Sequence, residues 1–140
     1  MKQMLMMTAL LLATAVTGFN CDKDNGDYTI LVDSDDTLYL LPGNYSGGSH
    51  GSLEAGDELK AEFSVLDGGG NIDFLVLSDA NLTLWESNQQ YEAVIEVANS
   101  TGDTRTGKVV TPGKHWFIAS NRDDTTAGRK VAYEVRRKDR

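Results

Sequence analysis

The sequence predicts an all-β fold, an antiparallel sandwich or jelly roll of about eight or nine short strands. Apolar and polar residues alternate in 59–65 and again in 131–135, which is the period of a half-buried strand. Turn-forming residues, among them Pro42-Gly43-Asn44 and Gly68-Gly69-Gly70, recur about every 8 to 12 residues. No segment carries a long amphipathic helical pattern. Short strands joined by frequent turns are typical of a sandwich.

The N-terminal segment 1–20 is predicted to be a signal peptide. Residues 4–16 are apolar apart from Thr8 and Thr14. As a helix this run would measure about 20 Å, which is short of the ~30 Å hydrocarbon core of a bilayer. We therefore expect cleavage and export, to the periplasm or the cell surface, and no membrane span. The cleavage site lies either after the triplet Ala13-Thr14-Ala15 or just before Cys21.

Cys21, the only cysteine, is predicted to carry a lipid anchor that attaches the protein to an envelope membrane. The acidic and polar residues 22–27 that follow it are expected to form a flexible tether. The residues before Cys21, Gly18-Phe19-Asn20, depart from the small residue that lipoprotein processing prefers. The alternative is a freely secreted domain with an unpaired thiol. Neither alternative gives the domain an internal disulfide.

The strands can be placed in chain order within a domain at 28–137. Segments 28–32 and 37–41 are weaker candidates, separated by the turn residues 33–36. The glycine-rich segment 47–51 is interpreted as a flexible loop. The next strand occupies 59–66, where alternation is clear, and a buried central strand occupies 72–77, where the run is apolar apart from Asp73.

The second half continues in the same way. Weaker strands are expected at 82–86, 91–98 and 106–111. A more buried strand at 115–120 is apolar on both faces, and the last strand occupies 129–135 before a basic tail at 138–140. The predicted core consists of Phe63, Phe74, Val76, Phe117, Val131 and Tyr133.

The distribution of charge limits which partners are expected and indicates which strands pair. The 140 residues carry a formal net charge of −8, so the protein should repel phosphate backbones, and nucleic acid is not expected as a partner. Segment 21–99 has 16 acidic and 2 basic residues, whereas 100–140 has 5 acidic and 10 basic residues. We therefore expect late strands to pair with early ones.

The order of motifs from Ala55 onward resembles that of GOLD-like domains, the β-sandwich of p24-type cargo receptors and of related bacterial and archaeal extracellular domains. The similarity rests on Gly70-Asn71-Ile72-Asp73-Phe74, on Pro112-Gly113 followed by the strand that closes at Asn121, and on the final strand with Lys130-Val131. A small pre-peptidase-type jelly roll is the alternative. The p24 cysteine pair, membrane span and cytosolic tail have no counterpart in this sequence, so Golgi sorting is not implied. The resemblance implies a noncatalytic extracytoplasmic domain of the binding or adaptor kind.

Four residues are candidates for binding: Asp73, Trp85, Trp116 and Asn121. Asp73 is too costly to bury without a partner, so it should accept hydrogen bonds from loop amides or a base, with a ligand contact as the alternative. The tryptophans are expected in the core, and a sugar-stacking surface is the alternative. Asn121 should close a turn with its side chain. The polar loops 44–52 and 121–128 are the predicted interaction surface.

Catalytic residues are not predicted. His50 and His115 are the only histidines, and no cysteine accompanies them, so a zinc site is not expected. No cofactor is predicted either. Calcium is the alternative, held by Asp22, Asp24 and Asp27 or by Asp33, Asp35 and Asp36, although neither set has the spacing of the twelve-residue calcium loop.

Two functions follow from these residues. The first is a noncatalytic binding or adaptor domain for a protein or another envelope component. The alternative is a small carbohydrate- or calcium-binding sandwich that is accessory to an enzyme. Buried tryptophans would favour the first function, and tryptophans exposed on one concave face would favour the second.

Overall fold

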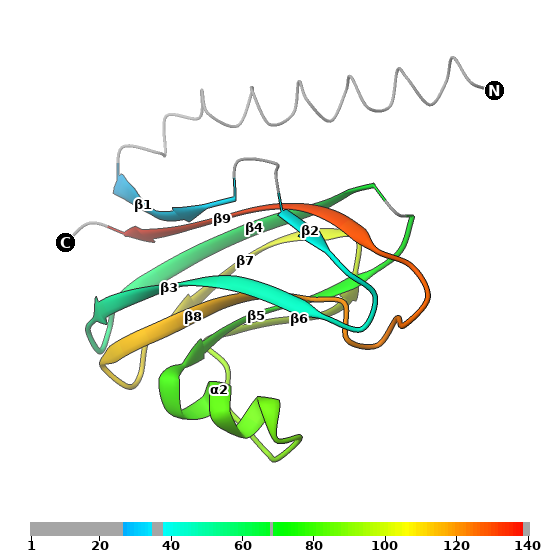
Figure 1. The fold of residues 1–140 in the computed structure, drawn as a ribbon. Coiled ribbons are helices and arrows are strands. Elements are labelled where there is room, and N and C mark those ends of the chain that lie inside the picture. The colour runs from blue at the N-terminus through cyan, green and yellow to red at the C-terminus, as the bar shows by residue number, and fades with distance from the viewer. Residues whose placement is uncertain (1–26, 35–37, 68, 139–140) are drawn as a thin grey trace.

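A computed structural model describes residues 27–34, 38–67 and 69–138, and these residues form two antiparallel sheets packed face to face (Figure 1). The signal peptide at 1–20, Cys21 and its anchor, the tether up to residue 26, and Asp35 and Asp36 all lie outside the described residues. No helix in the described ranges is both long enough and apolar enough to cross a bilayer.

The first sheet has the strand order β1-β9-β4-β7, with the short β2 also paired to β9. The second sheet has the order β3-β8-β5-β6. With β1 and β2 taken as two parts of one strand, this is the strand order of a jelly roll. The bounds are β1 Tyr28–Asp33, β2 Leu38–Leu40, β3 Tyr45–Leu53, β4 Glu58–Asp67, β5 Ile72–Ser78, β6 Ile95–Ser100, β7 Gly102–Lys108, β8 Gly113–Ser120 and β9 Arg129–Lys138.

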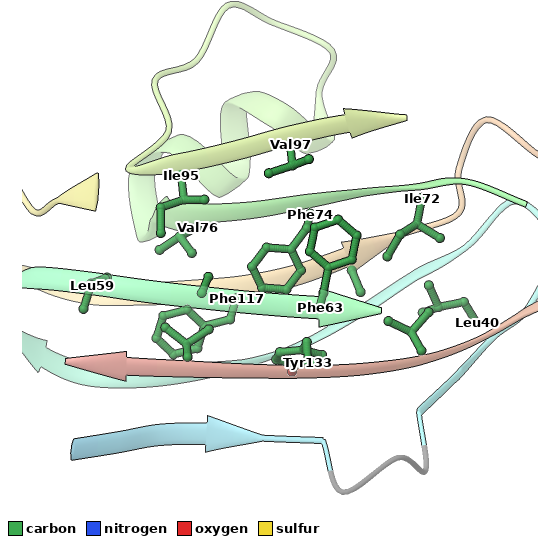
Figure 2. Packing of buried hydrophobic residues seen from close by; sticks show 14 of the residues in the cluster. Leu40, Leu59, Phe63, Ile72, Phe74, Val76, Ile95, Val97, Phe117 and Tyr133 are labelled. Atoms are coloured by element: carbon green, nitrogen blue, oxygen red, sulfur yellow. The ribbon is translucent and has the colours of Figure 1, made fainter. Parts of the chain in front are cut away.

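The core fills the space between the two sheets. Phe63 of β4 stacks on Phe74 of β5 with ring centroids 5.3 Å apart, and Tyr133 of the neighbouring strand β9 also packs against Phe74, with centroids 5.4 Å apart (Figure 2). All six residues predicted for the core are buried in one cluster. The inward residues of β4 and β9 pair across the sheet, Phe63 with Tyr133 for example, so the alternation seen in the sequence sets which face is buried. The predicted all-β sandwich is confirmed.

The glycine-rich segment predicted to be a loop is in fact part of strand β3. Gly47 pairs with Ile118 and Gly48 with Phe117 of β8. A Cβ on Gly47 would lie 2.0 Å from the carbonyl oxygen of Phe117, and one on Gly48 would lie 2.9 Å from Val32. The glycines therefore allow close approach of neighbouring chain segments, where the sequence alone indicated only a flexible segment. As a consequence, 44–52 is not a polar loop.

The strand predicted at 82–86 is wrong, because this segment is helical: α2 comprises Asp79–Glu86. The Ser78 hydroxyl accepts a hydrogen bond from the backbone N–H of Asn81 and caps the helix, and Asp79 lies in the first turn. α2 covers the side of the second sheet that faces away from the core (Figure 1). Trp85 and Leu82 pack there on Leu75, Leu77 and Ile118.

Other boundaries differ by several residues. The strand expected at 91–98 begins only at Ile95, and the one expected at 106–111 lies at Gly102–Lys108. Late strands do pair with early ones, since β9 lies between β1 and β4. The register does not place opposite charges together throughout, however. Glu62 lies directly opposite Glu134, and burial, followed by the charge of Glu134, raises the pKa of Glu62.

Candidate functional site

A polar cleft of about 200 Å³ lies at one end of the sandwich. Three connections meet there: the turn before β5, the turn between β6 and β7, and the loop between β8 and β9. The cleft is rich in side chains with hard oxygen atoms. Its lining consists of Asn71, Ile72, Asp73, Asn99, Ser120, Asn121, Asp123, Asp124 and Arg129.

Asp73 enters the cleft from the start of β5. Its Oδ1 accepts a 2.7 Å hydrogen bond from the backbone N–H of Asn99, at the end of the neighbouring β6. Burial raises the pKa of Asp73; this hydrogen bond opposes the rise, and the charges of Asp123 and Glu96 add to it. Asp73 thus has a backbone amide as its partner, and this amide belongs to strand β6 and not to a loop.

Asn99 continues the polar lining on the β6 side. It adopts a left-handed backbone conformation with φ of 52°, and its Oδ1 accepts a 3.0 Å hydrogen bond from Nδ2 of Asn71. Asn71 and Asn99 therefore hold the two turns together beside Asp73.

Asn121 follows β8 and is only 3% exposed. Its Nδ2 donates to the carbonyl oxygens of Leu41, at 3.3 Å, and Ala127, at 2.8 Å. The side chain therefore closes the loop between β8 and β9, as the sequence predicted. Its Oδ1 is buried and has no hydrogen-bond partner. Because two carbonyl acceptors fix the orientation of the amide, Oδ1 stays a buried acceptor without a donor in a residue that lines the cleft.

An ion pair fixes the rest of this loop. Arg129, 5% exposed, donates from Nη2 to Asp124 at 2.5 Å and from Nη1 to the carbonyl oxygens of Ala127 and Gly128. The other oxygen of Asp124 accepts from the backbone N–H groups of Thr126 and Ala127 and from the Thr126 hydroxyl. These hydrogen bonds, first those from Thr126, hold the pKa of Asp124 well below its ordinary range.

The guanidinium of Arg129 also needs Gly70 beside it. A Cβ at position 70 would lie 2.0 Å from Nη2 of Arg129. The glycine-rich turn before β5 therefore leaves room for the arginine that anchors the loop on the opposite side of the cleft.

The two tryptophans lie outside the cleft, on the side of the second sheet that α2 covers. Trp85 is 9% exposed. Arg122 lies over its ring at 4.5 Å, and the ring of Tyr45 meets it edge-on at 4.9 Å. Arg122 also donates to the carbonyl oxygen of Trp85 and to Asn88, so the loop at 121–128 is connected to α2.

Trp116 is half-buried and is engaged in a similar way. Its Nε1 donates a 2.8 Å hydrogen bond to Asp79 at the start of α2, and Lys114 lies over its ring at 4.3 Å. Both indole rings thus have intramolecular partners. Trp85 is buried in the cluster beneath α2, and Trp116 is partly buried against that cluster.

Of the four predicted binding residues, the structure brings Asp73 and Asn121 into one cleft and places Trp85 and Trp116 elsewhere. Sequence reasoning did not single out Asp123, Asp124 or Arg129. Asp123 and Asp124 lie in the loop 121–128, which was predicted to form part of the interaction surface. The prediction of that loop was therefore the only signal in the sequence that pointed to them. The pairing of Asp124 with Arg129 depends on how the loop folds.

The two histidines lie at the other end of β8, where His50 pairs with His115. His115 is buried, and its Nδ1 lies 3.0 Å from the carbonyl oxygen of Gly113. Within the described part of the chain, no three His, Cys, Asp or Glu side chains are grouped closely enough to hold a metal ion by themselves.

No family model and no curated protein matches this chain.

Proposed function

We propose that this protein is a noncatalytic binding or adaptor domain whose ligand site is the cleft at the loop end of the sandwich. The observation that carries the proposal is the rigid frame around the cleft. Asn121, Asp124 and Arg129 hold the loop through partly buried hydrogen bonds made within the chain itself. A site that is already ordered loses little conformational entropy on binding.

The polar groups of the cleft support binding better than proton transfer. The carboxylate of Asp124 is committed to Arg129 and to the loop amides, and Oδ1 of Asp73 is committed to Asn99. A general base needs a lone pair directed at a substrate and a pKa near the working pH. Asp124, with its depressed pKa, does not meet the second requirement.

The carbohydrate-binding alternative has less support, because it relies on a tryptophan face for stacking. Arg122 and Tyr45 pack against Trp85, and Lys114 covers Trp116. By the criterion of tryptophan exposure, the adaptor function is favoured. The resemblance to GOLD-like domains supports the same choice.

Export and attachment through Cys21 belong to the proposal, with an envelope protein or another envelope component as the partner. The signal-like segment 1–20 and the position of Cys21 directly after it support attachment. Mass spectrometry of the native protein should find an acylated N-terminus at Cys21. An unmodified N-terminus at Val16 or Phe19 would contradict the anchor and leave the binding site unaffected.

The binding site can be tested with a photo-crosslinking amino acid in the full chain, expressed in its own envelope. We expect a discrete cross-linked partner when the probe replaces Thr125, which is exposed in the loop beside the cleft. Thr104 is an equally exposed threonine on β7 and serves as the matched control. Identical cross-linking patterns from both positions would overturn the proposed site.

A further inference from the structure

We infer that the cleft binds a divalent cation, Ca²⁺, between the carboxylates of Asp73 and Asp123 and the amide oxygen of Asn121. The inference rests on the proposed function in that it uses the same cleft and names a ligand for it. Three features of the cleft carry it: uncompensated negative charge, a buried acceptor oxygen without a donor, and the kinds of ligand atom that line the wall.

The first feature is the charge balance. Four ionisable side chains line the cleft, and the only cation among them, Arg129, is paired with Asp124. None of the ion pairs within the described residues involves Asp73 or Asp123. These two carboxylates lie near enough for the charge of Asp123 to act on Asp73, and Glu96 adds a further negative charge. A cation in the cleft would remove this repulsion.

The second feature is Oδ1 of Asn121. Burying an amide oxygen without a donor is costly, so native structures rarely leave one unsatisfied. The Nδ2 atom is bound to Leu41 and Ala127, neither of which lines the cleft, so the amide cannot be turned around without losing both hydrogen bonds. Such an oxygen can coordinate a metal cation directly, and this interaction requires no proton donor.

The third feature is the chemistry of the wall. Carboxylate, amide and hydroxyl oxygens come from Asp73, Asp123, Asn121, Asn99 and Ser120, and no histidine or cysteine is among the lining residues. Calcium takes 6–8 such oxygen ligands in flexible geometry and accepts water for the remainder, whereas zinc prefers nitrogen and sulfur.

The affinity should be low, because among the described residues no three acidic side chains are grouped closely enough to hold a metal ion by themselves. Only two uncompensated carboxylates contribute full charge, and water must complete the shell. We expect a dissociation constant of about 10⁻⁴ to 10⁻³ M, the range of weak extracellular calcium modules. Such a site would be filled outside a cell and empty in a cytosol.

The test is a calcium titration of the full chain after treatment with a chelator, followed by calorimetry and by thermal unfolding. Wild-type protein should bind one Ca²⁺ and unfold at a higher temperature when the ion is present. Asp123→Asn should weaken binding by about tenfold or more, the size of effect seen for losses at metal sites. Asp123 is exposed on the loop, so this variant should fold normally.

Asp73→Asn is the second variant, because Asn keeps an acceptor oxygen for the N–H of Asn99 and removes only the charge. Glu92→Gln is the matched control: Glu92 is exposed and precedes β6, whose other end carries the cleft residue Asn99. This control should bind Ca²⁺ like the wild type.

Absence of saturable binding up to about 10 mM Ca²⁺, tenfold above the expected range, would overturn the inference. Equal binding by wild type and Asp123→Asn would also overturn it, as would binding of methylammonium with an affinity equal to that of Ca²⁺, because the cleft would then be a site for amines. These outcomes leave cross-linking from position 125 untouched. Loss of that cross-link with calcium binding retained would contradict the proposed partner site alone.

Discussion

At the residue scale, Asp124 has the largest structural role in the cleft. One carboxylate oxygen accepts from three donors of the loop, and the other pairs with the buried Arg129. An asparagine at this position would keep one acceptor oxygen and would offer Arg129 only a neutral amide. The charge is therefore needed to hold the loop, in addition to any role in binding.

We predict that Asp124→Asn lowers stability at neutral pH and that the difference from wild type shrinks in acid. The pKa of Asp124 is held below its ordinary value of 3.8, so the folded protein holds the proton less tightly than the unfolded chain. The stabilisation is complete above that value and is lost as pH falls from there toward the folded pKa. Urea unfolding at pH 7 and pH 3 measures it.

The control is Asp123→Asn, measured in chelator, because it removes a charge from the same loop without breaking this ion pair. It should leave the urea midpoint near that of the wild type at both pH values. A stability difference between wild type and Asp124→Asn that stays constant down to pH 2 would show that the carboxylate charge is not what stabilises the loop.

At the scale of one element, strand β3 depends on glycines that would weaken most strands. Gly47 lies against the backbone of Phe117, whereas a Cβ at Gly51 would meet no atom within 4 Å. Both are in β3, and neither has a left-handed backbone conformation. The two positions therefore separate the steric requirement for glycine from its general effect on a strand.

Gly47→Ala should destabilise the domain by about 1–3 kcal/mol, because the added methyl group forces β3 away from β8. Gly51→Ala should be neutral or stabilising by up to about 1 kcal/mol, since alanine reduces the entropy of the unfolded chain. Thermal or urea unfolding of both variants tests this. Equal effects of the two substitutions would mean that the close contact at Gly47 is not required.

At the scale of the whole molecule, two sheets are held together without a disulfide, so the core supplies the cohesion. Phe74 is fully buried and contacts aromatic rings from two strands of the facing sheet, Phe63 of β4 and Tyr133 of β9. Its loss removes contacts between the sheets as well as apolar area. Figure 2 shows these rings at the centre of the sandwich.

Phe74→Ala should cost about 3–5 kcal/mol, a large part of the stability of a domain of this size. We expect it to lower the unfolding midpoint cooperatively for both sheets, as followed by far-UV circular dichroism. Tyr39→Ala, which truncates an exposed aromatic residue on β2, is the comparison and should cost much less. Similar losses from both variants would place the main core elsewhere.

The sequence by itself determined the class of fold and six residues of the core. Alternation at 59–65 and 131–135 assigned Phe63, Val131 and Tyr133 to the buried face, because a period of two admits one inward face per strand. The apolar run at 72–77 identified the central strand. These patterns lie within single segments of the sequence, so they can be recognised without knowing which strands pair.

Local signals were misleading at α2 and β3. Segment 82–86 was expected to be a strand, but it belongs to helix α2, whose first turn is capped by the Ser78 hydroxyl. The glycines of β3 suggested a loop. In the structure, Gly47 instead allows the carbonyl of Phe117 to approach closely. A close approach between distant segments leaves no periodic pattern in the sequence.

The candidate site was decided by tertiary structure. Asp73 and Asn121 could each be singled out, but the sequence did not show that the two share a cleft with Asp123. Jelly-roll topology brings the ends of β6 and β8 and the start of β5 to the same end of the sandwich. The charge left uncompensated there depends on which carboxylate Arg129 pairs with, and that choice is made by the packed loop. Pairing between residues that are distant in sequence is set by the topology of the whole chain, which no single segment encodes.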